Sequence, residues 1–257
     1  MSKDLKIYFA SDFHLGVPNR EKSLIREKRV VRWLDMVSKD ADEIYLLGDV
    51  WDFWFEYSKA VPKGYVRLLG KLAELSDSGI KLHFFTGNHD LWTFGYLEEE
   101  IGLTVHREPE LRTINGKTYF IGHGDGLGPG DKGYKFLKKV FTHPICQWLF
   151  ARVHPNLSFS IAEYFSRKSR LANGDVDMEY LGDEEWLYQF AKESNLKNVS
   201  QYYIFGHRHL PLEVSVDDSS VYYNLGEWIH FNSYGVIEGE RFELKFFESD
   251  YTKALNK

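Results

Sequence analysis

Apolar and polar positions alternate in blocks along the first 90 residues, and the apolar blocks predict short buried strands. The runs LKIYFASD (5–12), EIYLLGDVWDF (43–53) and IKLHFFTGNHD (80–90) each begin apolar and end in polar residues. Short apolar runs bounded by turn residues are typical of strands that are buried on both faces. The three runs therefore predict three strands that each carry polar side chains at the carboxyl end.

Two amphipathic stretches separate these strands. Residues 23–38 (SLIREKRVVRWLDMVS) carry apolar side chains at helical spacing, and we expect Ser23 to cap this helix. Residues 64–79 form a second amphipathic stretch that stops near Gly79. The order strand, helix, strand, helix, strand predicts parallel strands that are joined by right-handed crossovers.

The pattern changes beyond residue 102, where strands predominate around one helical segment. The dipeptide Asn115-Gly116 separates two apolar runs, which predicts a tight hairpin. We expect one layered α/β domain over residues 1–257, with two sheets and a helical insertion at about 130–172. The further elements that we expect are strands within 103–126, helices at 131–171 and 183–195, and strands within 201–248.

Composition narrows the class of protein without fixing its activity. The 257 residues are 43% hydrophobic and 27% charged, as in ordinary globular proteins. The single cysteine, Cys146, excludes an internal disulfide framework and favours a reducing compartment. Neither a signal peptide nor a long apolar run is evident, so we expect a cytoplasmic protein. The net charge of −6 argues against a general nucleic-acid coat, and no protein partner is inferred.

Metal-competent side chains follow five of the predicted strands. One such ending is more often a turn than a ligand site, but five in one chain point to a common site, since the carboxyl ends of strands in open α/β sheets form sites together. In Asp12-x-His14 and His207-x-His209 the spacing of two would place both side chains on one face of an extended segment. The candidate ligands are Asp12, His14, Asp49, Asn88, His123, His207 and His209.

Seven ligands are too many for one tetrahedral ion. Two carboxylates, one amide and four imidazoles suit two ions that share a bridging carboxylate. This mixture of nitrogen and oxygen donors favours Mn²⁺, iron or Zn²⁺ over Mg²⁺.

The motifs D-x-H, G-D, G-N-H-D, G-H and G-H-x-H, in this order over about residues 7–230, resemble those of the calcineurin-like metallophosphoesterase family. The resemblance implies a four-layer α/β/β/α sandwich with two divalent ions, for which we favour Mn²⁺. It also implies that Asp49 bridges the ions. Asp12, His14 and His209 would complete the first site, and Asn88, His123 and His207 would complete the second.

The resemblance also assigns roles next to the metals. His89 matches the family's catalytic histidine, which would stabilise charge on the phosphoryl group or protonate the leaving oxygen. Asp90 would orient the ring of His89. The implied reaction is phosphoester hydrolysis by an activated water.

The expected insertion differs in composition from the rest of the chain. Residues 132–171 contain eight Lys or Arg, one acidic residue (Glu163) and eight aromatic residues. Such a segment favours contact with an anionic membrane surface or an anionic amphiphile. Two alternatives stay open: a helical pair that packs on the domain with solvated lysines outside, and a nucleic-acid patch.

A narrower resemblance bears on the substrate. The stretches SDFHLG, LLGDVWDFWF, GNHDLW, HGDGLGPGDKGYKFLKKVF, GHRHLP and NLGEWIHF are similar to the UDP-2,3-diacylglucosamine pyrophosphatase branch of the family. That branch releases UMP and 2,3-diacylglucosamine 1-phosphate during lipid A synthesis, and a helical lid covers the acyl chains. The resemblance implies such a lid here, with Arg167, Lys168 and Arg170 meeting phosphates. Some members of the branch have Arg at the position of His89.

Other functions remain open at this stage. Another phosphoesterase of the family would prefer small nucleotides or phosphodiesters. A peripheral position on the cytoplasmic face of the inner membrane would follow if the insertion contacts lipid. A non-catalytic scaffold, such as the retromer subunit of this superfamily, would be expected to lose ligand residues, whereas all seven are intact here.

Overall fold

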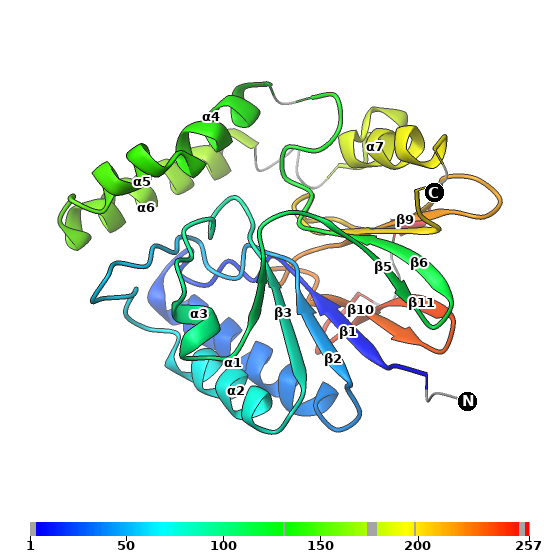
Figure 1. The fold of residues 1–257 in the computed structure, drawn as a ribbon, viewed down its shortest axis with the longest axis horizontal. Coiled ribbons are helices and arrows are strands. Elements are labelled where there is room, and N and C mark those ends of the chain that lie inside the picture. The colour runs from blue at the N-terminus through cyan, green and yellow to red at the C-terminus, as the bar shows by residue number, and fades with distance from the viewer. Residues whose placement is uncertain (1–3, 131, 174–178, 198, 252–254, 257) are drawn as a thin grey trace.

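The computed structural model describes residues 4–130, 132–173, 179–197, 199–251 and 255–256. Two six-stranded sheets form its centre (Figure 1). The first sheet has the order β11 (Arg241–Phe246), β10 (Ser233–Glu238), β1 (Ile7–Ala10), β2 (Glu43–Leu46), β3 (Lys81–Phe85) and β4 (Thr104–His106). The second has the order β12 (Leu255–Asn256), β8 (Pro211–Ser215), β9 (Val221–Leu225), β7 (Tyr202–Phe205), β6 (Lys117–Ile121) and β5 (Glu110–Ile114).

The predicted parallel order at the N-terminus is confirmed. Strands β1, β2, β3 and β4 pair in parallel, and helices α1 (Arg20–Val37) and α2 (Val66–Asp77) connect the first three. The short helix α3 (Tyr96–Glu99) precedes β4. The carboxyl ends of β1, β2 and β3 therefore lie next to one another at one edge of the sheet.

Three apolar layers show that the molecule is a four-layer α/β/β/α sandwich. Along β1 the side chains alternate: Tyr8 and Ala10 pack with α1 and α2, whereas Ile7 and Phe9 pack between the two sheets. A third cluster lies between the second sheet and α7 (Trp186–Asn195), which follows the 3₁₀ helix η2 (Gly182–Glu184). Figure 1 shows α1 and α2 on one side of the sheets and α7 on the other.

The predicted hairpin is confirmed, but the predicted helix cap is wrong. Asn115 and Gly116 both have positive φ, 48° and 81°, which suits the tight turn between β5 and β6. Helix α1 begins three residues before Ser23, because the side chain of Asn19 accepts a hydrogen bond from the Lys22 N–H (3.0 Å). The hydroxyl of Ser23 instead accepts the N–H of Gly16 (2.8 Å).

The expected insertion consists of three helices, α4 (Lys132–Thr142), α5 (Pro144–Phe150) and α6 (Pro155–Asn173). They form an arm at one end of the sandwich (Figure 1). The arm contacts the loops that follow β2 and β3: Trp92 Nε1 donates to the carbonyl of Phe141 (2.8 Å), and the hydroxyls of Tyr57 and Ser158 lie 2.5 Å apart. These contacts place the arm beside the polar strand ends.

We expect Trp33→Ala to lower the free energy of unfolding by about 3–5 kcal/mol, because a fully buried large side chain would leave a cavity. Trp33 is 0% exposed and packs edge-on against Phe13 and Trp228. Denaturant unfolding measures the change. Met36→Ala on the same helix is the control, since Met36 is 36% exposed and should change stability by only about 0.5 kcal/mol. Equal effects of the two substitutions would contradict this packing.

Candidate metal centre

Five of the seven candidate ligands lie just beyond the strand ends in a backbone conformation that side chains rarely adopt. Asp12, His14 and Asp49 have φ of 55°, 43° and 51°, and His207 and His209 have φ of 67° and 59°. The expectation that the spacing of two acts through an extended segment is therefore wrong. The side chains converge because left-handed backbone turns each of them inward, and such strain is held at sites where surrounding structure enforces it.

Two glycines allow the strand ends to approach closely enough for this convergence. A Cβ on Gly48 would lie 2.7 Å from His123 Nδ1, and a Cβ on Gly87 would collide with the carboxylate of Asp49. A backbone hydrogen bond also joins the ends of β1 and β2: the N–H of Asp12 donates to the carbonyl of Gly48 (3.0 Å). A glycine is therefore required before the polar residue, because a side chain there would collide with the neighbouring strand end.

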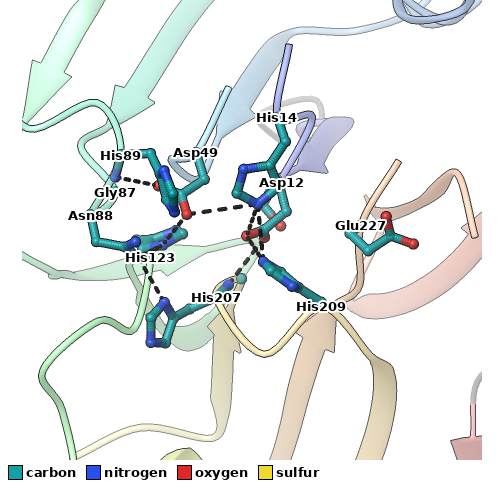
Figure 2. A network of polar contacts seen from close by, with 12 residues as sticks. Asp12, His14, Asp49, Gly87, Asn88, His89, His123, His207, His209 and Glu227 are labelled. Atoms are coloured by element: carbon teal, nitrogen blue, oxygen red, sulfur yellow. Dashed lines mark hydrogen bonds and ion pairs between the residues drawn. The ribbon is translucent and has the colours of Figure 1, made fainter. Parts of the chain in front are cut away.

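The first group of ligand atoms is formed by Asp12, His14, Asp49 and His209 (Figure 2). The Nε2 atoms of His14 and His209 lie 3.0 Å apart. Asp12 Oδ1 lies 3.7 Å from His14 Nε2 and 3.3 Å from His209 Nε2. All of these atoms lie within 4.8 Å of one another, which is compatible with one shared ion.

The second group is formed by Asp49, His123 and His207, with Asn88 beside them (Figure 2). Asn88 Oδ1 lies 2.9 Å from His207 Nδ1 and 3.2 Å from His123 Nε2. His123 Nδ1 lies 2.6 Å from the carbonyl oxygen of Leu47, so Nδ1 donates its proton to this carbonyl and Nε2 is the atom left to bind a metal. The structure thus brings together all seven candidate ligands.

Asp49 belongs to both groups. Its Oδ2 atom lies 3.8 Å from His14 Nε2 and 3.4 Å from His123 Nε2, while its Oδ1 atom accepts the N–H of His89 (2.9 Å). A carboxylate shared by two clusters of imidazoles is the arrangement that a bridged pair of ions requires.

The donor set fits divalent cations on electrostatic grounds. Asp12 and Asp49 are buried to 0% and 1% exposure, and within the described residues neither forms an ion pair with a lysine or arginine. Asp12 Oδ1 is also buried without a hydrogen-bond partner in the described part of the chain. Buried carboxylates and polar atoms left in this state are costly unless a cation compensates them.

Two imidazoles differ in how their surroundings change the pKa. Burial lowers the pKa of His207 to about 4, so its ring is neutral and able to bind a metal at neutral pH. Burial also opposes charge on His123, but the adjacent Asp49 carboxylate outweighs it and raises the pKa of His123 to about 10. A cation that occupies the second group would therefore displace a proton from His123.

His89 lies beside the centre, but Asp90 does not orient its ring as expected. The His89 and His14 rings lie 5.0 Å apart between centroids, and His89 Nδ1 lies 2.8 Å from the backbone carbonyl of Asp52. Asp90 instead accepts backbone N–H groups of Gly87 (2.7 Å) and Val50 (2.8 Å). It therefore braces the loops that carry Asp49 and Asn88.

The three basic residues expected to meet phosphates cannot be compared with this geometry. Arg167, Lys168 and Arg170 fall within α6, and their side chains lie outside the described residues.

A family model and similar proteins agree with this geometry. The model for calcineurin-like phosphoesterases matches residues 5–211. The chain belongs to the calcineurin-like phosphoesterase family. It is 39% identical to a UDP-2,3-diacylglucosamine hydrolase of Porphyromonas gingivalis, over 95% of this chain and 98% of that protein.

More distant similarities extend the comparison. The chain is 26% identical to a UDP-2,3-diacylglucosamine hydrolase of Edwardsiella ictaluri, over 82% of this chain and 79% of that protein. It is also similar to the solved structure of Yfce, a phosphoesterase from E. coli, with a TM-score of 0.48, 15% identity and 97% of each chain covered.

Two further carboxylates of this phosphoesterase, Asp52 and Asp125, lie at the site although the sequence patterns did not assign them a role. Asp52 Oδ1 lies 3.7 Å from His14 Nδ1. Asp52 Oδ2 accepts a hydrogen bond from the hydroxyl of Ser166 on α6 (2.8 Å). Asp125 accepts the hydroxyl of Tyr134 (2.5 Å) and pairs with Lys138 (2.7 Å), both on α4. Asp52 follows Asp49 at the end of the same run, and that position was the available signal. Both carboxylates connect the arm to the metal centre.

We expect metal loading of the wild-type protein at pH 8 to release about one proton more than loading of His123→Ala. The reason is that His123, with a pKa of about 10, is protonated without metal and must be neutral as a ligand. Calorimetric titration with Mn²⁺ in two buffers of different ionisation enthalpy measures the number of protons. Equal proton release by both proteins would contradict the assignment of His123 to the second group.

Proposed function

We propose that this phosphoesterase hydrolyses the diphosphate of UDP-2,3-diacylglucosamine to UMP and 2,3-diacylglucosamine 1-phosphate, a step of lipid A synthesis. One observation carries the proposal: two groups of candidate metal ligands that share Asp49 lie next to an aromatic cluster beneath a helical arm. A substrate with both a diphosphate and acyl chains needs these two environments side by side. The names of the relatives from Porphyromonas gingivalis and Edwardsiella ictaluri support the same substrate.

The ligand assignment is part of the proposal. Asp12, His14 and His209 would hold one ion, Asn88, His123 and His207 the other, and Asp49 would bind both. Bound there, two divalent ions would neutralise phosphoryl oxygens and make a water nucleophilic near neutral pH. The nitrogen and oxygen donors suit Mn²⁺, iron or Zn²⁺, and among these we favour Mn²⁺ because of the resemblance to the family.

His89 would act on the leaving group. Its side chain is 22% exposed, so it is accessible to substrate, while the hydrogen bond to the Asp52 carbonyl fixes the ring through Nδ1. The Nε2 atom is then free to stabilise charge on the phosphoryl group or to give a proton to the departing oxygen. Asp90 would contribute by holding the Asp49 and Asn88 loops in place rather than by touching substrate.

The chain would be a single domain in which α4, α5 and α6 form a lid for the acyl chains. Where the arm meets the domain, the ring of Phe53 packs against the rings of Trp92, Phe150 and Phe159, with 5.7, 6.3 and 5.4 Å between ring centroids. This cluster offers apolar surface close to the candidate metal ligands, because Phe53 directly follows Asp52 in sequence and Asp52 lies beside His14 and His89. Acyl chains buried against such surface would gain about 0.8 kcal/mol per methylene.

Arg167, Lys168 and Arg170 would meet phosphate oxygens from α6. The support is the position of the preceding residue: the Ser166 hydroxyl is hydrogen-bonded to Asp52 (2.8 Å), so this turn of α6 lies beside the metal centre.

The outer surface of the arm suits a peripheral contact with an anionic membrane. Among the described residues no helix has both the length and the apolar character needed to cross a bilayer. Aromatic and aliphatic side chains are nevertheless exposed on all three helices, within a segment of net positive charge. They include Phe136 (66%), Ile145 (63%), Trp148 (57%) and Phe165 (59%).

We expect the purified protein with Mn²⁺ to release UMP from UDP-2,3-diacylglucosamine much faster than it cleaves bis-p-nitrophenyl phosphate. His89→Ala should retain its metal and lower kcat for the lipid about 10²–10⁴-fold, because it removes a proton donor. His14→Ala and Asp49→Ala serve as controls for contaminating activity. Binding of the lipid without release of UMP would contradict the proposed substrate.

We expect liposomes that contain anionic lipid to co-sediment with the protein at low salt, and less so at high salt because charge is screened. Trp148→Ala should weaken the association, since Trp148 is 57% exposed on the arm. Leu111→Ala, on β5 outside the arm and 54% exposed, is the matched control. Recovery in the supernatant with and without anionic lipid would rule out this membrane contact.

A further inference from the structure

A cavity of about 460 Å³ adjoins the metal centre on a side that the acyl chains would not use. The candidate metal ligand His123 and the loop up to Leu127 line it, together with residues 106–109 at the end of β4 and one side of α4. Its volume falls within the range of small-molecule sites. The aromatic rings that form the cluster beneath the arm are not among its lining residues.

Positive charge predominates in the cavity. Its cations are Arg107, Lys135, Lys138 and Lys139, against the carboxylates of Glu108 and Asp125. Lys138 neutralises Asp125 at 2.7 Å, and Arg107 pairs with Glu98 at 3.1 Å.

Two of the other side chains remain available to a ligand. Lys139 is exposed and, as far as the described residues show, has no ion-pair partner. Glu108 is exposed at the same cavity, and the described residues provide no ion-pair partner for it either. A ligand that offers both an anionic group and hydroxyl donors satisfies this pair, because carboxylates only accept hydrogen bonds. A bare phosphate would be repelled by Glu108.

We propose that this cavity binds the nucleoside monophosphate part of the substrate. The inference rests on the proposed function, in which the diphosphate lies at the two ions and the acyl chains lie against the aromatic cluster. The remaining part of such a substrate is polar, anionic and rich in hydroxyls, and it has to extend from the same ions. The cavity begins at His123 and provides the matching charge, with Lys139 directed to phosphate and Glu108 to the ribose hydroxyls.

The test uses UMP as a competitor rather than the lipid as a substrate. Hydrolysis of bis-p-nitrophenyl phosphate by the Mn²⁺-loaded full-length protein is measured with increasing UMP, and separately with inorganic phosphate. UMP should inhibit at a lower concentration than phosphate. Lys139→Glu should raise the inhibition constant for UMP about fivefold, because charge reversal replaces attraction with repulsion, and should change that for phosphate much less.

Lys132→Glu is the matched control, because Lys132 is exposed on the same helix but does not line the cavity. It should leave inhibition by UMP unchanged. An inhibition constant for UMP that is unaffected by Lys139→Glu, or equal for UMP and phosphate, would overturn the proposal. A protein that does not cleave the lipid but shows Lys139-dependent inhibition by UMP would retain the nucleotide site and lose the proposed substrate.

Discussion

The site depends on the burial of two carboxylates that no lysine or arginine of the described chain neutralises. Asp12 and Asp49 lie at the ends of neighbouring parallel strands, surrounded by imidazoles and backbone. Uncompensated charge in such a place destabilises a fold. Protonated His123 offsets part of the charge of Asp49 when no metal is bound, and cations between the ligands would compensate both carboxylates. Parallel pairing of β1, β2 and β3 brings the strand ends together, and left-handed backbone then aims the side chains at a common centre.

The surroundings of the centre divide into two regions of opposite character. An aromatic cluster under the arm suits acyl chains, whereas a basic cavity beside His123 suits a nucleotide. Helix α4 takes part in both, since the Phe141 carbonyl accepts from Trp92 while Lys139 lines the cavity. On the proposed function, the arm can therefore distinguish the two ends of an amphiphilic substrate. It can do so without altering the ligands that perform the hydrolysis.

The sequence was sufficient for the fold and for the seven candidate ligands that the structure brings together, because both depend on local patterns. Apolar runs marked the strands, and polar residues after Gly marked their ends. Contacts between distant segments were not predictable in this way. Asp90 follows His89 in sequence yet serves the backbone of Gly87 and Val50, while Asp52, from another strand end, holds the His89 ring.

The helix cap and the geometry of the ligand pairs show the same limit. Ser23 is a good cap by residue type, but Asn19 is equally suitable one turn earlier. The hydroxyl of Ser23 instead accepts a partly buried hydrogen bond from the N–H of Gly16. The spacing of two in Asp12-x-His14 suggested an extended segment, whereas both residues have positive φ. Composition likewise indicated an amphiphilic insertion, but only the tertiary structure separated its apolar surroundings from the basic cavity.

Anomalous diffraction from crystals of the Mn²⁺-loaded protein tests the central claim most directly. We expect two metal peaks about 3.5–4 Å apart with the Asp49 carboxylate between them. Asp12, His14 and His209 should surround one peak, and Asn88, His123 and His207 the other. A single peak, or two peaks without Asp49 between them, would contradict a centre of two ions that share this carboxylate.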